Sequence, residues 1–224
     1  VSLKIPIYTL MDLETFIDSP VYQFRTPQID SLAPILKIKN DIPIIVHAPS
    51  NREIKGTPIV VKTIDKLRTS GYQFEFFLME NLSNKTVLEK LKEADIVIDQ
   101  PGLWAGRLAI EGMAHSCVVV GGNNSNYEKG NIRLPIIEFK RDQDLLFEQL
   151  KYLIERNSLK DMRLEFYQCY QNFYSPAAFV KHLTGVLDGV ISPELFPPDD
   201  HKNKLLQATE NAFQRLIIRL FIRK

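Results

Sequence analysis

The sequence is poor in cysteine and lacks the common short motifs of catalysis and metal binding. Its two cysteines, Cys117 and Cys169, are too few for a disulfide framework, and they stand in the apolar or aromatic stretches SCVVV and YQCYQ. We therefore expect two reduced, buried thiols in a reducing compartment. The motifs CxxC, HExxH and GxSxG are absent, as are a P-loop and a GxGxxG turn after a strand. The missing glycine-rich turn argues against an ordinary NAD or FAD oxidoreductase.

Long hydrophobic runs and an excess of one charge are also missing. No stretch approaches the roughly 20 apolar residues of a membrane-spanning helix. No secretory signal opens the sequence, which begins with Val1 instead of Met, so we expect a cytoplasmic protein and either a processed chain or part of a longer one. The net charge of +1 argues against nucleic-acid binding along the whole chain. With 224 residues, 45% of them hydrophobic, the chain can bury a sizeable core.

The central part of the chain alternates between strand-like and helix-like segments. Short apolar runs predict strands over residues 43–48, 72–79, 95–99, 117–120 and 135–139. Helices are predicted between them, one with Thr57 as N-cap and Pro58 in its first turn, one capped by Asn84 or Thr86, and one over 106–115. Three more follow over 142–156, 159–174 and 176–190. This alternation implies an α/β fold, a Rossmann-like doubly wound parallel sheet with extra C-terminal helices.

The chain is predicted to have four regions. Residues 1–41 form an N-terminal flank, 42–190 a Rossmann-like domain, 191–200 a linker rich in Pro and Asp, and 201–224 a basic amphipathic helix. The last region carries six Lys and Arg against the single acid Glu210, beside a broad apolar face. Such a helix suits peripheral contact with an anionic membrane surface, and packing on the sheet, on a missing lobe or on another chain is the alternative.

The first candidate binding region is the loop 48–56. Ligands of a doubly wound sheet bind at the carboxyl ends of its strands, near helix N-termini that favour anions. The loop carries Arg52 and Lys55 at a helix start, where cations are unfavourable unless an anion is present, and Gly56 permits a close backbone turn. One interpretation is a phosphate site with the two cations as charge partners. The other is two solvated loop residues.

The second candidate region is the loop 99–106 with the helix that follows it. The loop contains the single tryptophan, Trp104, among glycines and a proline. In the helix, Arg107, Glu111 and His115 are spaced i, i+4 and i+8, so they share one face. The simpler interpretation is a thin polar stripe toward water with Arg107 and Glu111 as a surface ion pair. His47, at the end of a strand, either faces a ligand or bonds to neighbouring backbone.

Three stretches, taken in order, resemble one protein family. HAPSNREIKGT, EADIVIDQ and GLWAGRLAIEGMAHSCVVVGG are similar to the C-terminal, donor-binding half of GT-B glycosyltransferases of the retaining family-4 type. The later stretch YQCYQNFYSPAAFVKHL is similar to the closing helices of that family. The resemblance covers residues 42–187. It implies the C-terminal half of a GT-B fold and an enzyme that transfers a hexosyl group from a nucleoside-diphosphate sugar with retention.

The resemblance also implies roles for individual residues. Lys55, with Arg52, would meet the donor diphosphate and balance charge on the departing nucleotide, and Glu111 would hold the donor ribose hydroxyls. Lys55 and Glu111 are thus the implied catalytic residues. The implied donor-binding set is Ser50, Asn51, Arg52, Lys55, Gly56, Trp104, Gly106, Arg107 and Glu111. No metal and no cofactor are implied, and the partners would be the nucleotide sugar and a glycan, lipid or protein acceptor.

The sequence departs from the family in two respects. Leu103 stands where many members carry a second glutamate, eight positions before Glu111. Only about 40 residues precede the matching region, fewer than the roughly 100 of an acceptor-binding lobe. We expect either the donor-binding half of a longer transferase, whose N-terminal lobe is missing, or a non-catalytic binding or assembly domain of the same fold.

Overall fold

The computed structural model describes residues 7–9, 21–23, 42–102, 105–122, 134–156 and 159–188. These residues fall into two units, a larger one within 42–181 and a smaller one with 7–9, 21–23 and 182–188. The smaller unit contains a parallel pair of short strands, β1 (Ile7–Thr9) and β2 (Val21–Gln23). The predicted linker and the predicted basic helix lie outside the described residues.

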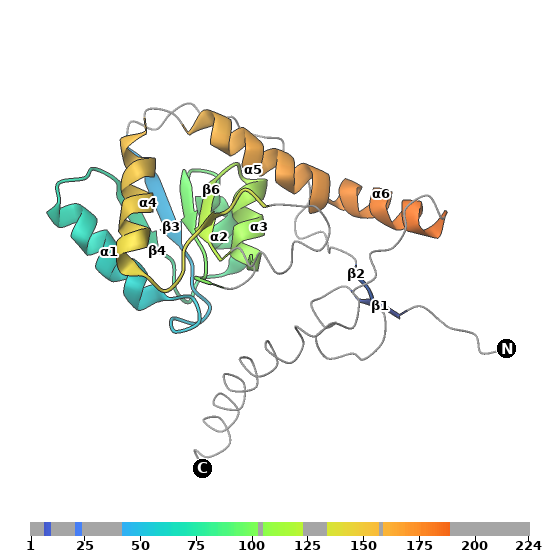
Figure 1. The fold of residues 1–224 in the computed structure, drawn as a ribbon, viewed down its shortest axis with the longest axis horizontal. Helices are drawn as coiled ribbons and strands as arrows, with labels where there is room; N and C mark the ends of the chain where they lie inside the picture. The colour runs from blue at the N-terminus through green and yellow to red at the C-terminus, as the bar shows by residue number, and fades with distance from the viewer. Residues whose placement is uncertain are drawn as a thin grey trace, which may run out of the picture. The chain divides into compact units, whose positions relative to one another are not determined.

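The larger unit (Figure 1) is built on a five-stranded parallel sheet, and its strands have the order β4-β3-β5-β6-β7. Its strands are β3 (Ile44–His47), β4 (Glu75–Leu78), β5 (Ile96–Ile98), β6 (Val118–Gly121) and β7 (Ile137–Glu138). The helices are α1 (Thr57–Thr69), α2 (Asn84–Leu91), α3 (Arg107–Ala114), α4 (Gln143–Glu155), α5 (Lys160–Phe173) and α6 (Pro176–Leu187), the last of which crosses the division between the units. The predicted α/β, Rossmann-like parallel sheet is confirmed.

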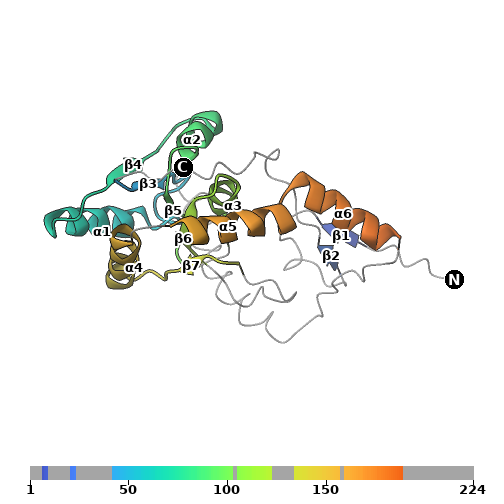
Figure 2. The same ribbon diagram turned by 90° about the horizontal axis from the view of Figure 1, so that it is seen from above.

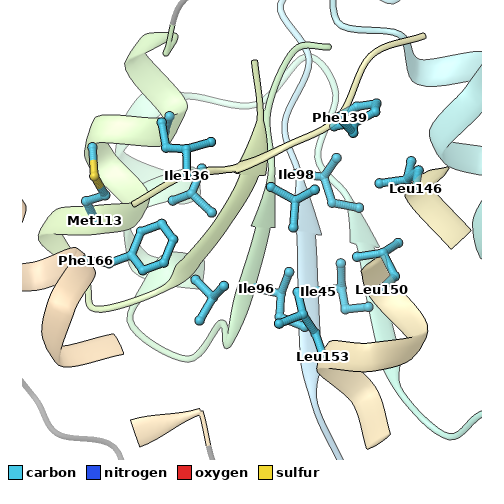
Figure 3. Close-up of a cluster of buried hydrophobic side chains, with 14 of the residues drawn as sticks. Ile45, Ile96, Ile98, Met113, Ile136, Phe139, Leu146, Leu150, Leu153 and Phe166 are labelled. Carbon is cyan, nitrogen blue, oxygen red and sulfur yellow. The ribbon is translucent and has the colours of Figure 1, made fainter. Parts of the chain in front are cut away.

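Helices cover both faces of this sheet (Figure 2), because successive strand side chains point to opposite sides. On one face α1 and α4 pack together, and a cluster there joins Ile45, Ile96 and Ile98 of the strands to Leu150 and Leu153 of α4 (Figure 3). On the other face α2 and α3 pack against a second cluster, made of Val46, Val87, Leu91, Val97 and Leu108. The sheet is therefore buried on both sides, as its nearly continuous apolar strands predict.

Helix α3 lies close to the sheet because of Gly112. A Cβ at this position would be 3.1 Å from Cγ2 of Val97 and 3.3 Å from Cγ2 of Val119. Gly112 therefore lets the second half of α3 lie directly on β5 and β6. Both cysteines are buried and neither is in a disulfide, as predicted.

The first helix begins differently from the prediction. Its N-cap is Gly56, with a φ of 64°, so Thr57 is already inside α1 and does not cap it. The Thr57 hydroxyl instead lies 2.9 Å from Nε2 of His47, at the end of β3. A buried partner for this hydroxyl outweighed its use as a cap.

The second helix also has a different cap. Ser83 is the N-cap of α2, and its hydroxyl accepts the backbone N–H of Thr86 at 3.2 Å. The predicted caps, Asn84 and Thr86, both lie within the helix. The Asn84 side chain has a different partner, which belongs to the site described below.

An ion pair stabilises the amino edge of the sheet. Arg163 of α5 pairs with Asp95, and both side chains are buried. Asp95 also accepts the backbone N–H of Ile44, at the start of β3, at 2.8 Å. Burial lowers the pKa of Arg163 from its ordinary value. Within the described ranges, no helix has the length and apolar character needed to cross a bilayer.

Candidate functional site

Three loops leave the sheet at the carboxyl ends of neighbouring strands. They are residues 48–56 after β3, 79–83 after β4, and the described residues 99–102 and 105–106 after β5. Because the strands are parallel, these loops meet at one edge, where ligands of such sheets bind. An Arg52–Glu80 ion pair joins the first loop to the second, and a Lys55–Asp99 ion pair joins the first to the third.

The Lys55–Asp99 pair is buried at this edge. Lys55 Nζ lies 2.6 Å from Oδ1 of Asp99, and the two side chains are 11% and 1% exposed. The second carboxylate oxygen, Oδ2, accepts the backbone N–H of Gly106 at 2.7 Å. Asp99 therefore fixes both the ammonium of Lys55 and the start of α3. The alternative of a solvated Lys55 is wrong, because its partner lies in the interior.

Gly106 is required here for space. Its φ of −76° and ψ of 175° are open to any residue. A Cβ at this position, however, would lie 2.6 Å from Oδ2 of Asp99 and 2.8 Å from Nζ of Lys55. Any side chain at Gly106 would push the ion pair apart. Gly56 is different, because its φ of 64° is left-handed and a Cβ there would also meet Pro101 at 2.8 Å.

Glu111 is a buried carboxylate on α3, with only 3% of its side chain exposed. Its Oε1 atom accepts two hydrogen bonds, from Nε of Arg107 at 2.8 Å and from Nδ2 of Asn84 at 2.9 Å. None of the hydrogen bonds that the described residues make to Glu111 reaches Oε2. The site thus holds a charged acceptor oxygen that is still available to a donor.

The polar stripe of α3 does not face water as the simpler interpretation assumed. Glu111 and His115 are buried, and only Arg107 is largely exposed, at 63% of its side chain. The spacing correctly placed the three on one face, but that face is turned toward the start of α2. His115 is the C-cap of α3, and its Nδ1 donates to the carbonyl oxygen of Glu111 at 2.7 Å.

Arg52 lies apart from Lys55. Its side chain is 52% exposed, and Nη1 donates to both carboxylate oxygens of Glu80 at 2.7 and 2.6 Å. Ser50 is exposed in the same loop. Asn51 shapes that loop, because its Oδ1 accepts the backbone N–H groups of residues 53 and 54 at 3.0 Å. Arg52 is therefore a surface cation and Lys55 an interior one.

Both ring nitrogens of His47 form hydrogen bonds within the fold, to residues outside the Lys55–Asp99 and Glu111 groups. Nδ1 donates to the carbonyl oxygen of Ile98 at 2.8 Å, so Nε2 of the neutral ring accepts from the Thr57 hydroxyl. Burial lowers the pKa of His47 below its ordinary value of 6.5. The expectation of a histidine bonded to nearby backbone is confirmed. Its ring joins β3, β5 and the first residue of α1 beneath the loop that carries Lys55.

The sequence analysis missed three members of this site, and Glu80, the partner of Arg52, is one of them. Asp99 ends a buried strand at its carboxyl edge, which is a recognisable signal. Asn84 carried no signal beyond its suitability as a cap. The predicted residue Trp104, with the replaced position Leu103, lies outside the described residues. Within the described ranges, no group of three or more His, Cys, Asp or Glu side chains is arranged to hold a metal ion.

Comparison with known proteins finds the fold but no sequence relative. No family model matches this chain, and no curated protein matches it. A solved structure described as the GtfA/B complex is similar with a TM-score of 0.58 and 9% identity, over 75% of this chain and 40% of that one. A glycosyltransferase from Rickettsia africae ESF-5 is similar with a TM-score of 0.52 and 15% identity, over 68% and 48%. The chain thus shares their fold and spans less than half the length of either.

Proposed function

We propose that this chain is the donor-binding part of a glycosyltransferase, which transfers a hexosyl group with retention from a nucleoside-diphosphate sugar. The observation that carries the proposal is the buried carboxylate of Glu111. Its Oε1 atom accepts two hydrogen bonds, and its Oε2 atom accepts none from the described residues. The fold shared with a Rickettsia glycosyltransferase and the ordered motifs of residues 42–187 support it.

Glu111 is suited to bind the ribose of the donor. An ionised carboxylate only accepts hydrogen bonds, and ribose hydroxyls donate them. Such charge-assisted bonds are roughly twice as strong as neutral ones. Arg107 pairs with Oε1 of Glu111 from the solvent side, so this ion pair leaves Oε2 without a partner among the described residues. In this proposal Oε2 takes the ribose hydroxyls.

Lys55 is suited to bind the diphosphate. An ammonium group has three donors, and Asp99 uses one of them. The Lys55 side chain is 11% exposed, and in this proposal its remaining donors bind the diphosphate at the carboxyl edge of the sheet. A cation held in place by a buried partner needs no reorganisation as negative charge develops on the departing nucleotide. Lys55 therefore serves in place of a metal ion, with Arg52 at the outer rim.

Transfer itself belongs, in this proposal, to a longer protein. The chain spans 40% and 48% of the two solved chains that share its fold. An N-terminal lobe would bind the acceptor, which is a glycan, lipid or protein. The basic region 201–224 would hold the enzyme on an anionic membrane or pack on another part of the protein.

One observation favours a second candidate function, a non-catalytic binding or assembly domain of the same fold. Each basic residue of the predicted donor-binding set is paired with an acid. The pairs are Arg52–Glu80, Lys55–Asp99 and Arg107–Glu111. The three ion pairs together carry no net charge, whereas a diphosphate is attracted to uncompensated cations. The two candidates differ in whether the chain binds a nucleotide.

Calorimetric titration of the chain with UDP, GDP, ADP and their hexose conjugates tests the proposal. We expect one of these series to bind the wild-type chain. The double variant Lys55→Met/Asp99→Asn removes the ammonium without stranding a buried charge. This variant should bind the nucleoside diphosphate at least about ten-fold more weakly, a factor that corresponds to one charge-assisted hydrogen bond.

Lys62→Ala is the matched control, since Lys62 is an exposed lysine on α1. It should leave the affinity unchanged. Failure of the wild-type chain to bind any of these ligands would refute the donor-binding proposal and favour the assembly domain. Equal affinities of the wild type and the double variant would remove Lys55 from the site.

A further inference from the structure

Asn84 joins α2 to the carboxylate of α3. It is the first residue of α2, and its Nδ2 atom donates to Oε1 of Glu111 at 2.9 Å across 27 residues of sequence. The residue as a whole is exposed, yet its partner is almost completely buried. Substitution of Asn84 can therefore remove a hydrogen bond to the buried Glu111 carboxylate while the change itself is made at an exposed residue.

The two donors to Oε1 differ in rigidity. Arg107 reaches Glu111 from the same helix, one turn earlier, with a long and largely exposed side chain. Asn84 reaches it from a different element with a short side chain, and its backbone is fixed by the Ser83 cap just before it. The terminal torsion of a glutamate is broad and two-fold, so bonding at one oxygen decides where the other points. Asn84 is therefore the firmer of the two restraints.

We infer that Asn84 is a positioning residue for donor recognition, which holds Oε1 of Glu111 so that Oε2 faces the ribose hydroxyls. This inference rests on the proposed function and adds a residue outside the predicted set. This role requires the side-chain amide of Asn84, because its nitrogen donates a hydrogen bond to Oε1. A carboxylate at position 84 would present an acceptor to Oε1 and repel Glu111.

The test compares each nucleoside diphosphate with its 2′,3′-dideoxy counterpart by calorimetry. The ratio of the two dissociation constants isolates the ribose hydroxyls from the base and the phosphates. For the wild type we expect a ratio of about ten, the value of one hydrogen bond to a charged group. In Asn84→Asp and Asn84→Ala the ratio should fall to about two or less, because Oε2 is no longer held in place.

Two comparisons separate positioning from a structural role. An acid in the first turn of a helix is favourable and offsets the repulsion by Glu111, so Asn84→Asp should keep a melting temperature near that of the wild type while its ratio of dissociation constants falls. Gln73→Ala removes another exposed amide, near the amino end of β4, and should keep both. A lost ratio with an unchanged melting temperature supports the inference.

The failures are distinguishable. Unchanged ratios in both Asn84 variants overturn the inference and leave the proposed function standing. A wild type that binds the ribose and dideoxy forms equally also overturns it, while nucleotide binding survives. A wild type that binds none of UDP, GDP and ADP overturns the inference together with the proposed function.

Discussion

Lys55→Met should destabilise the fold by about 3–5 kcal/mol, because it leaves a buried carboxylate without its counter-ion. Asp99 is 1% exposed, and the ammonium of Lys55, 2.6 Å away, is its one ionic partner among the described residues. After the substitution the backbone N–H of Gly106 is the one remaining hydrogen bond to the Asp99 carboxylate among the described residues. One hydrogen bond does not replace the hydration that the carboxylate loses in the interior.

The reciprocal and double variants sharpen this prediction. Asp99→Asn should cost less, about 1–2 kcal/mol, because the long Lys55 side chain can carry its charge to water. The free energy of unfolding of Lys55→Met/Asp99→Asn should lie within about 1 kcal/mol of that of the wild type, since an uncharged pair of similar volume replaces the ions. Urea unfolding of the four proteins at neutral pH gives the coupling energy directly. A loss below about 1 kcal/mol for Lys55→Met alone would refute the assignment of a buried, paired carboxylate.

Three further predictions concern residues away from the ligand. Because burial lowers the pKa of His47 below 6.5, the unfolded chain takes up a proton there first as the pH falls. The stability from His47 is complete above this value and is lost below it, so His47→Gln should show a shallower loss of unfolding free energy from about pH 7.5 to about pH 5; equal slopes would contradict this. Ser83→Ala should cost about 1 kcal/mol by removing the cap of α2, and an unchanged melting temperature would reject that cap. Arg163→Met should cost about 3–5 kcal/mol, and adding Asp95→Asn should restore most of it in chemical unfolding; no recovery would show that the Arg163 stem, not its charge, stabilises this edge.

The fold was predictable because its signals are local. Apolar runs marked each strand of the sheet, and the structure shortens four of them, most at 72–79, where β4 keeps four of the eight residues. The run 117–120 keeps its length and is shifted by one residue in β6. Strand length depends on the ladder with the neighbouring strand, which a single run does not encode. The caps of α1 and α2 were each misplaced because Thr57 and Asn84 found tertiary partners that compete with capping.

The site was predictable only in part, because its contacts are distant in sequence. The motifs and the helical spacing predicted that Lys55, Gly106 and Glu111 lie at the carboxyl edge of the sheet. The ion pair of Lys55 with Asp99 spans 44 residues, and no local pattern encodes such a distance. Spacing likewise placed Glu111 on the polar face of α3 but could not show that another helix covers this face. Local rules predict which residues share a face, and packing decides which faces meet.

The strand order has a consequence for synthesis of the chain. β3 is the first strand of its sheet to be made, yet it ends between β4 and β5. During synthesis, β3 with its residues Ile45 and Val46, which are fully buried in the folded chain, is therefore made before either of its neighbouring strands. The second edge closes only when β5 has emerged, and an open strand edge is a template for aggregation. A nascent or truncated chain that stops before Ile96 should thus depend on chaperones far more than the finished protein does.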